Sequence, residues 1–189
     1  MRHIKTMGLL VAASLSFAIA LPAAATDVLV TTNLGSFTIK LDEQKAPVSS
    51  ANFLKYVKDG SYKGTIFHRV IPGFMAQGGG FTENFDRLPT YAPIKNESNN
   101  GLQNVKASVA MARTQDPDSA TRQFYINYND NHFLDGKPAK AGYAVFGHVI
   151  KGFSVVEKMA AIPTKSDRMR RMADIPTKPI VIEKMEVVK

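Results

Sequence analysis

Short apolar runs bounded by turn-forming residues recur along almost the whole chain after residue 25, and they constrain its fold more than any other feature. Two of them, at 28–30 and 37–41, are separated by Asn33-Leu34-Gly35, which is typical of a β-hairpin. The pattern predicts six further strands, at 65–71, 74–77, 108–112, 123–127, 144–150 and 180–188. A chain with this many short strands is predicted to be mainly β.

Only two segments follow helical periodicity. The first begins at Pro47, which suits the first turn of a helix, carries Phe53 and Val57 on one apolar stripe, and ends at Gly60. The second is expected at 153–162. Because strands and helices do not alternate regularly, a doubly wound parallel sheet is disfavoured. The sequence instead favours a closed eight-stranded antiparallel β-barrel capped by two α-helices.

The first 25 residues have the composition of a targeting segment. Arg2 and Lys5 provide a positive start, 7–21 is mostly apolar, and Ala23-Ala24-Ala25 supplies small residues for cleavage. A membrane-spanning helix needs about 20 apolar residues, and this run is shorter. We therefore expect a signal peptide over 1–25, followed by a single domain over 26–189.

The composition agrees with export and disfavours several classes of protein. With no cysteine, the chain is neither a disulfide scaffold nor a lipoprotein anchored through cysteine. The formal net charge is +8, and the leader supplies two of these charges. A nucleic-acid-binding protein concentrates its basic residues, and the cluster of Lys165, Arg168, Arg170 and Arg171 is interpreted as a solvated loop. We expect no nucleic-acid partner, no membrane association after cleavage, and a monomer.

The densest chemical signal is the segment 67–79, FHRVIPGFMAQGG. Strand alternation predicts Phe67, Arg69 and Ile71 on one face and His68 on the other, where it is interpreted as a structural hydrogen-bonding residue. An arginine among large hydrophobic residues needs a polar partner or a ligand for its guanidinium. The alternative is a surface arginine whose stem covers apolar neighbours.

Two further segments favour the functional interpretation of Arg69. One joins 108–113, SVAMAR, to 119–126, which contains Gln123-Phe124-Tyr125; the other joins 133–136, FLDG, to 145–147. Together with the FHRVIPGFMAQGG segment, they resemble the cyclophilin family in order and spacing across nearly the whole mature chain. Within that family, the chain is similar to the exported, periplasmic bacterial members, and a periplasmic location is expected from that resemblance.

The resemblance implies a peptidyl-prolyl cis-trans isomerase that acts on proline-containing segments of unfolded or partly folded exported proteins. Arg69 stands at the position of the family's catalytic arginine, and Gln77 at that of the glutamine that hydrogen-bonds the bound backbone. Six further positions resemble the family's substrate-binding residues: Phe74, Met75, Phe124, Leu134, Ala112 and Arg113. The first four match the proline pocket, and the last two match the backbone that holds the residue before proline.

Three departures from the family pattern lie at the expected groove. Phe133 stands where many eukaryotic members carry tryptophan, and because it lacks an indole N–H donor, cyclosporin binding is expected to be weak. Arg113 stands where many members have asparagine. Tyr143 stands where those eukaryotic members have histidine, after a small insertion at 137–142. We expect Tyr143 and the insertion, at the edge of the groove, to alter which substrates the groove prefers.

The implied reaction fits the residues present. Rotation about an Xaa-Pro bond breaks no covalent bond, so it requires neither a nucleophile nor a metal, and no cofactor is expected. The main alternative is a binding module or holdase that retains proline segments without fast turnover. A phosphate-binding role for Gly78-Gly79-Gly80 is disfavoured because no P-loop lysine follows. A hydrolase is disfavoured because there is no cysteine and no G-x-S-x-G turn after the leader.

Overall fold

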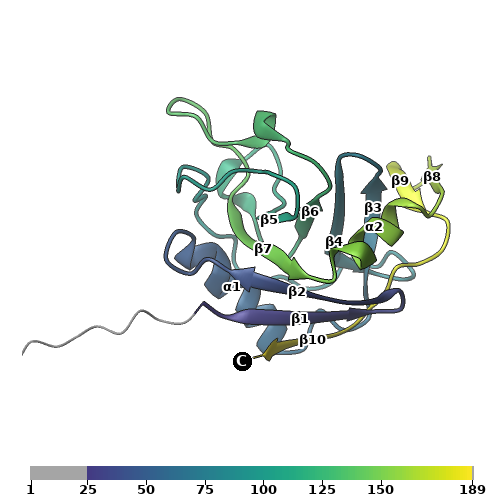
Figure 1. The fold of residues 1–189 in the computed structure, drawn as a ribbon. Helices are drawn as coiled ribbons and strands as arrows, with labels where there is room; N and C mark the ends of the chain where they lie inside the picture. The colour runs from purple at the N-terminus through teal and green to yellow at the C-terminus, as the bar shows by residue number, and fades with distance from the viewer. Residues whose placement is uncertain (1–24, 189) are drawn as a thin grey trace, which may run out of the picture.

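The computed structural model describes residues 25–188, which form a curled antiparallel sheet, two helices and a separate hairpin (Figure 1). The sheet has the strand order β10-β1-β2-β7-β5-β6-β4-β3. Its strands are β1 Asp27–Thr32, β2 Gly35–Leu41, β3 Thr65–Ile71, β4 Met75–Thr82, β5 Ser108–Met111, β6 Phe124–Asn127, β7 Val145–Lys151 and β10 Ile182–Val188. All but the last residue of the expected signal peptide lies outside the described residues.

The predicted mainly-β fold with eight antiparallel strands is confirmed, but the predicted closure of the barrel is wrong. The sheet is open and strongly curled, with β3 and β10 at its edges. Just before β10 begins, the chain is joined to β3 by an isolated bridge between Ile66 and Val181 and by a backbone hydrogen bond from Phe67 N–H to the Ile180 carbonyl, 2.9 Å. This stretch follows Pro179, whose nitrogen cannot donate to a ladder.

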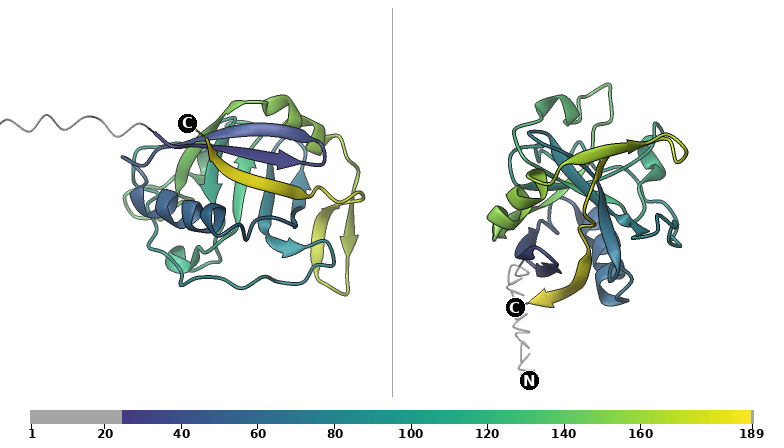
Figure 2. Two further views of the ribbon diagram at one scale, coloured as in Figure 1. Left: turned by 90° about the horizontal axis from the view of Figure 1, so that it is seen from below. Right: turned by 90° about the vertical axis from the view of Figure 1, so that its right-hand side faces the viewer.

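Both predicted helices are confirmed, and they lie at opposite ends of the curled sheet (Figures 1 and 2). Helix α1, Pro47–Lys58, packs against β7 and β10, and helix α2, Phe153–Ala160, packs against β2, β3 and β4. The Glu97 carboxylate accepts the backbone N–H groups of Val48 at 2.9 Å and Ser49 at 2.7 Å. A distant loop therefore caps α1 with a negative charge. Within residues 25–188, no helix has the length and apolar character needed to cross a bilayer.

Apolar side chains gather in two clusters, because alternate residues of each strand point to opposite faces of the sheet. The larger cluster fills the concave side and is called the interior core; it includes Phe124 and Ile126 of β6. The smaller, called the outer cluster, has Met75, Ala110, Tyr125 and Val145 at its centre, with Ile71, Phe74, Leu102, Ala112, Leu134 and Tyr143 around them. Five of the ten residues expected in the groove lie in the outer cluster: Phe74, Met75, Ala112, Leu134 and Tyr143.

Strand β3 departs from simple alternation at His68. Its pairing with β4 shifts between Phe67 and Arg69, which stand opposite Gly78 and Gln77. At such a β-bulge, two residues of one strand lie opposite one residue of the partner strand, and the alternation of side chains is broken. Phe67 lies in the interior core, whereas His68 and Arg69 line the same outer pocket. The predicted arrangement, with Phe67 and Arg69 on one face and His68 on the other, is therefore wrong.

A second hairpin, β8 Thr164–Asp167 and β9 Met172–Pro176, contains the basic cluster that was interpreted from the sequence as a solvated loop. Strand β9 packs along β3, next to which it is seen in Figure 1. Strand β8, TKSD, is polar, and β9, MADIP, is short and ends in proline, so neither has the apolar alternation from which a strand is recognised. The hairpin brings basic residues close to Arg69.

Candidate active site

The outer cluster surrounds a pocket of about 220 Å³, which is called the apolar groove. It brings together most of the site residues predicted from the sequence. Its lining consists of Arg69, Phe74, Met75, Gln77, Ala112, Arg113, Tyr125, Leu134 and Tyr143. These residues come from β3, β4 and the turn between them, from β6, and from the segments that follow β5 and precede β7. Segments that are far apart in the sequence thus form one site on the outer face of the sheet.

Phe124 was predicted to line the proline pocket, and this is wrong. Its side chain is fully buried in the interior core, where its ring packs edge-on against Phe53 at 5.4 Å and Tyr62 at 5.6 Å. Tyr125 lines the groove instead. A shift of one residue along a strand moves a side chain to the other face of the sheet. The alternation of Gln123 and Tyr125 around Phe124 was the sequence signal that could have identified the correct residue.

A buried hydrogen-bond network supports the floor of the groove. The Tyr125 hydroxyl donates to Asn104 Oδ1 at 2.7 Å, and Asn127 Nδ2 donates to the same oxygen at 3.2 Å. Asn104 Nδ2 in turn donates to Asp135 at 3.0 Å. Burial raises the pKa of Tyr125 well above its ordinary value, so the phenol remains a proton donor. Sequence reasoning missed Asn104, which lies in a loop without a recognisable motif.

Phe133 lies at the rim of the groove, outside its lining. Its side chain is 71% exposed and stacks on Phe74, with ring centroids 5.7 Å apart and an interplanar angle of 23°. Phe74 does line the groove, so Phe133 extends the aromatic surface outward from it. This position offers a ligand a ring face but no N–H donor.

Arg113, at one edge of the groove, donates hydrogen bonds to the inserted segment 137–142. Its guanidinium donates from Nε to the Gly142 carbonyl at 3.0 Å, from Nη2 to Ala141 at 2.9 Å and from Nη1 to Thr114 at 2.9 Å. The same group lies over the Tyr143 ring, 4.5 Å from its centroid. These contacts hold the insertion and Tyr143 in position beside the groove.

Arg69 stands at the boundary between the apolar groove and a second pocket. Its Nε lies 3.4 Å from Oδ2 of Asp174 in β9, and the two side chains are 41% and 36% exposed. Asp174 has a φ of 59°, a conformation that aspartate tolerates better than most residues. Sequence reasoning missed Asp174 because β9 was not predicted and no motif contains it.

The Gln77 side chain is held by Gln123, which immediately precedes β6, the strand that pairs with β4. Its Nε2 donates to Gln123 Oε1 at 2.8 Å. A Cβ on Gly80 would approach Gln123 Cγ to 2.6 Å, so this glycine leaves the space that the Gln123 side chain occupies. The glycine run lies inside β4, and at this position it serves close packing.

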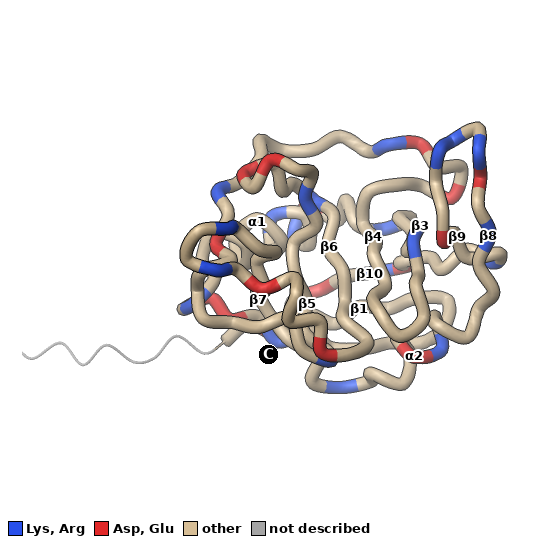
Figure 3. Tube along the Cα trace, turned by 90° about the horizontal axis from the view of Figure 1, so that it is seen from above, with Lys and Arg blue, Asp and Glu red and all other residues tan. Residues whose placement is uncertain are grey.

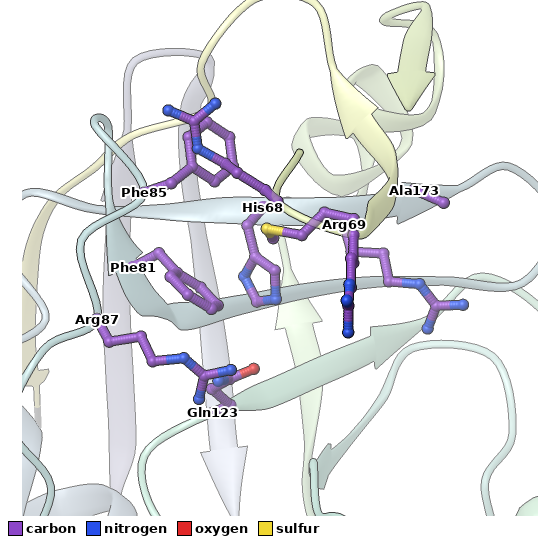
Figure 4. A pocket seen from close by; sticks show the side chains of 10 residues that line it. His68, Arg69, Phe81, Phe85, Arg87, Gln123 and Ala173 are labelled. Carbon is purple, nitrogen blue, oxygen red and sulfur yellow. The ribbon is translucent and has the colours of Figure 1, made fainter. Parts of the chain in front are cut away.

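The second pocket, called the arginine pocket, has a volume of about 650 Å³ (Figure 4). Its lining consists of His68, Arg69, Phe81, Phe85, Arg87, Gln123, Arg170, Arg171, Met172 and Ala173. His68 is only 4% exposed, and burial, assisted by the charge of Arg69, lowers its pKa to about 4. The ring is therefore neutral at physiological pH. Arg69 and Gln123 connect this pocket to the groove.

Comparison with known proteins gives consistent results. The family model described as cyclophilin type peptidyl-prolyl cis-trans isomerase/CLD matches residues 27–187. The chain is 50% identical over 164 residues to peptidyl-prolyl cis-trans isomerase A of Dickeya dadantii, covering 87% of this chain and 85% of that protein. It is 53% identical over 156 residues to a peptidyl-prolyl cis-trans isomerase of Acinetobacter baylyi, covering 82% of each. A Cryptosporidium parvum cyclophilin type isomerase, solved in the presence of the dipeptide Ala-Pro, superposes with a TM-score of 0.70 at 26% identity, covering 86% of this chain and 99% of that one.

Proposed function

The chain belongs to the cyclophilin-type peptidyl-prolyl cis-trans isomerase family, and we propose that it uses Arg69 and the apolar groove to rotate Xaa-Pro bonds in exported proteins. Isomerase activity follows from the family and its relatives. The observation that carries the proposed mechanism is a charged side chain, 41% exposed, at the rim of a pocket lined largely by apolar and aromatic groups. A related isomerase was solved in the presence of Ala-Pro, so a proline residue is the expected occupant of this pocket.

The barrier to rotation comes from amide resonance, about 18 to 20 kcal/mol, and uncatalysed exchange takes tens to hundreds of seconds. As the bond twists, the proline nitrogen becomes pyramidal and regains a lone pair. The Arg69 guanidinium can donate a hydrogen bond to that lone pair, which a planar amide offers poorly. Because arginine stays protonated and offers several donors in a fixed fork, it binds the twisted amide better than either planar isomer.

The required acceleration exceeds what one donor supplies. Raising exchange from about 0.01 per second to roughly 1000 per second lowers the barrier by about 7 kcal/mol. One positioned donor contributes about 3 to 4 kcal/mol. We assign the remainder to holding the proline ring against Phe74, Met75, Tyr125 and Leu134, to anchoring the backbone at Gln77 and Ala112, and to exclusion of water.

The test is the replacement Arg69→Ala. Exchange of short Xaa-Pro peptides is measured by NMR exchange spectroscopy, which needs no coupling protease. We expect kcat/KM to fall by about a hundredfold or more, because the donor that distinguishes the twisted amide is lost. The circular dichroism and thermal unfolding of the variant should match those of the unmutated protein, because the Arg69 side chain is only partly buried.

Arg168→Ala is the matched control, since Arg168 is exposed and lines neither the apolar groove nor the arginine pocket. Its kcat/KM should stay within about twofold of the original, as is usual for a surface substitution. Full activity in Arg69→Ala would contradict the mechanism. Peptide binding without accelerated exchange in the unmutated protein would favour a holdase.

We also propose that the protein works in the periplasm after removal of the leader. The support is the positive start, apolar run and small residues within 1–25, together with the absence of cysteine. Cell fractionation followed by N-terminal sequencing should recover a periplasmic chain that begins near Thr26. Recovery of the intact chain from the cytoplasm would overturn this part of the proposal.

Weak binding of cyclosporin is proposed on separate grounds. Phe133 presents an exposed ring where an indole N–H would be available in many eukaryotic members. Titration calorimetry of the protein and of Phe133→Trp should give tighter binding for the tryptophan variant, and equal affinities would contradict the assignment of Phe133.

A further inference from the structure

Four arginines from three separate segments line the arginine pocket. Arg69 belongs to β3, Arg87 to the loop after β4, and Arg170 and Arg171 to the β8–β9 hairpin. Figure 3 shows basic segments of the hairpin beside β3, and Figure 4 shows Arg69, His68, Arg87 and Gln123 around the pocket. Basic groups that are remote in sequence therefore converge on one pocket.

Only part of this positive charge is balanced within the protein. Arg69 pairs with Asp174, and Arg170 pairs with Asp167. Among residues 25–188, no carboxylate oxygen lies within 4.0 Å of the guanidinium nitrogens of Arg87 or Arg171. The pocket thus holds two arginines that can accept an anionic partner.

Aromatic side chains restrict two of the guanidinium groups. Arg87 lies over the Phe81 ring at 5.2 Å, and Arg170 lies over the Phe85 ring at 5.2 Å. Contact with an aromatic face leaves the in-plane N–H donors of a guanidinium available. Holding the groups before a ligand arrives reduces the entropy lost on binding.

The inner wall of the pocket contains a polar atom without a protein partner. Nδ1 of His68 is buried and makes no hydrogen bond within residues 25–188. The ring packs edge-on against Phe81 at 4.7 Å. A neutral imidazole nitrogen can donate or accept one hydrogen bond, so this wall can contribute a polar contact without adding charge.

The arginine pocket adjoins the side of the groove where the chain before the proline is expected. Arg69 lines both pockets, and Gln123, which lines the arginine pocket, hydrogen-bonds Gln77 of the groove. Ala112 is the position expected to hold the residue that precedes the proline, and its backbone N–H donates to the Gln123 carbonyl at 3.0 Å. A substrate chain that continues past Ala112 and Gln123 therefore meets the arginine pocket.

From this arrangement, and resting on the proposed function, we propose that the arginine pocket is a specificity subsite. It binds the carboxylate of an aspartate or glutamate at the third residue before the proline of the substrate chain. Arg87 and Arg171 supply the charge-assisted hydrogen bonds. The enzyme consequently prefers proline segments preceded by an acidic residue.

The test compares three peptides in NMR exchange spectroscopy. Two are identical except for Glu or Gln at the third residue before proline, and the third carries the Glu three residues after proline. We expect kcat/KM to be about fivefold higher for the first peptide than for the other two, the effect of a partly exposed ion pair. The preference should fall towards one in about 0.5 M salt, because salt screens such a pair.

The variant for this test combines Arg87→Gln with Arg171→Asn. Asparagine is chosen because Arg171 has a φ of 53°, which asparagine tolerates. We expect it to lose the preference for Glu while the Gln peptide is exchanged within about twofold of the original rate. The matched control combines Lys58→Gln with Lys151→Asn, exposed positions outside the pocket that give the same loss of charge, and it should keep the preference.

Equal rates for the Glu and Gln peptides in the unmutated protein would overturn the proposal. So would a preference that persists in the double variant, because the acidic group would then bind elsewhere. Both results are distinguishable from failure of the Arg69 mechanism, which would appear as undiminished exchange of the Gln peptide by Arg69→Ala.

Discussion

The apolar groove and the arginine pocket lie on either side of Arg69, yet they are built from the chain in different ways. The groove is lined by strands β3, β4 and β6 and adjoining turns, whose motifs are recognisable in the sequence. The arginine pocket depends on the loop after β4 and on the β8–β9 hairpin, which carry no such motif. Two arginines and six apolar or aromatic side chains line the groove, whereas four arginines line the other pocket. On the two proposals made above, one region serves the twisted amide and the other serves the flanking sequence.

In β6, Phe124 belongs to the interior core and Tyr125 lines the groove, and the two positions should respond differently to replacement. Phe124→Ala should lower the free energy of unfolding by about 3 to 5 kcal/mol, because it leaves a cavity in the interior core. Tyr125→Phe removes a single hydrogen bond to Asn104 and should cost about 1 kcal/mol. Urea denaturation measures both values. Similar small losses in the two variants would contradict the assignment of Phe124 to the core.

The buried histidine distinguishes the arginine pocket from the groove in its response to pH. The pKa of His68 is lowered from 6.5 to about 4, mainly by burial and then by Arg69. Between pH 6.5 and about 4, the unfolded chain therefore binds more protons at this histidine than the folded chain does. The contribution of the neutral His68 to the free energy of unfolding is fully present above pH 6.5 and is lost as the pH falls towards 4. The loss should approach about 3 kcal/mol.

Denaturation of the unmutated protein and of His68→Gln across this interval measures the effect. The variant should show a shallower decline of stability with falling pH, since its side chain does not titrate. Parallel curves would place the acid sensitivity elsewhere in the molecule.

Asp174 contacts the arginine shared by the two regions, so its replacement should affect them differently. Asp174→Asn keeps a residue that tolerates a φ of 59° and removes a partly exposed negative charge. We expect kcat/KM for the Gln peptide to change by less than about threefold and the preference for the Glu peptide to rise by about two- to threefold. A fall in the Glu preference would show that Asp174 supports the anion subsite rather than opposing it.

The smallest expected effect concerns turnover in the groove. Because an arginine guanidinium does not titrate near neutrality, kcat/KM for the Gln peptide should vary by less than about twofold between about pH 6 and 9. NMR exchange rates across this interval provide the measurement. A bell-shaped profile would instead place a histidine or another ionisable side chain in the mechanism.

Much of the groove was predictable because its residues belong to strands and turns with strong local patterns. Arg69, Met75 and Gln77 were identified from one continuous segment and do line one pocket. Phe124 was misplaced because the motif identifies the strand, while the choice between Phe124 and Tyr125 depends on which face the strand turns outward. Asn104, which lies in a loop, and Asp174, which lies in β9, contact groove residues from distant segments and had no pattern by which to be recognised.

Periodicity and turn residues report short-range preferences, and they were sufficient to identify the eight strands of the sheet, the two helices and the order of the motifs. The open sheet, the bulge that turns His68 and Arg69 to the same side, and the capping of α1 by Glu97 depend instead on long-range packing. The same holds for the pocket that Arg87 and Arg171 share. These features arise from packing between segments far apart in the chain, and such packing leaves no signature in the local pattern of either segment.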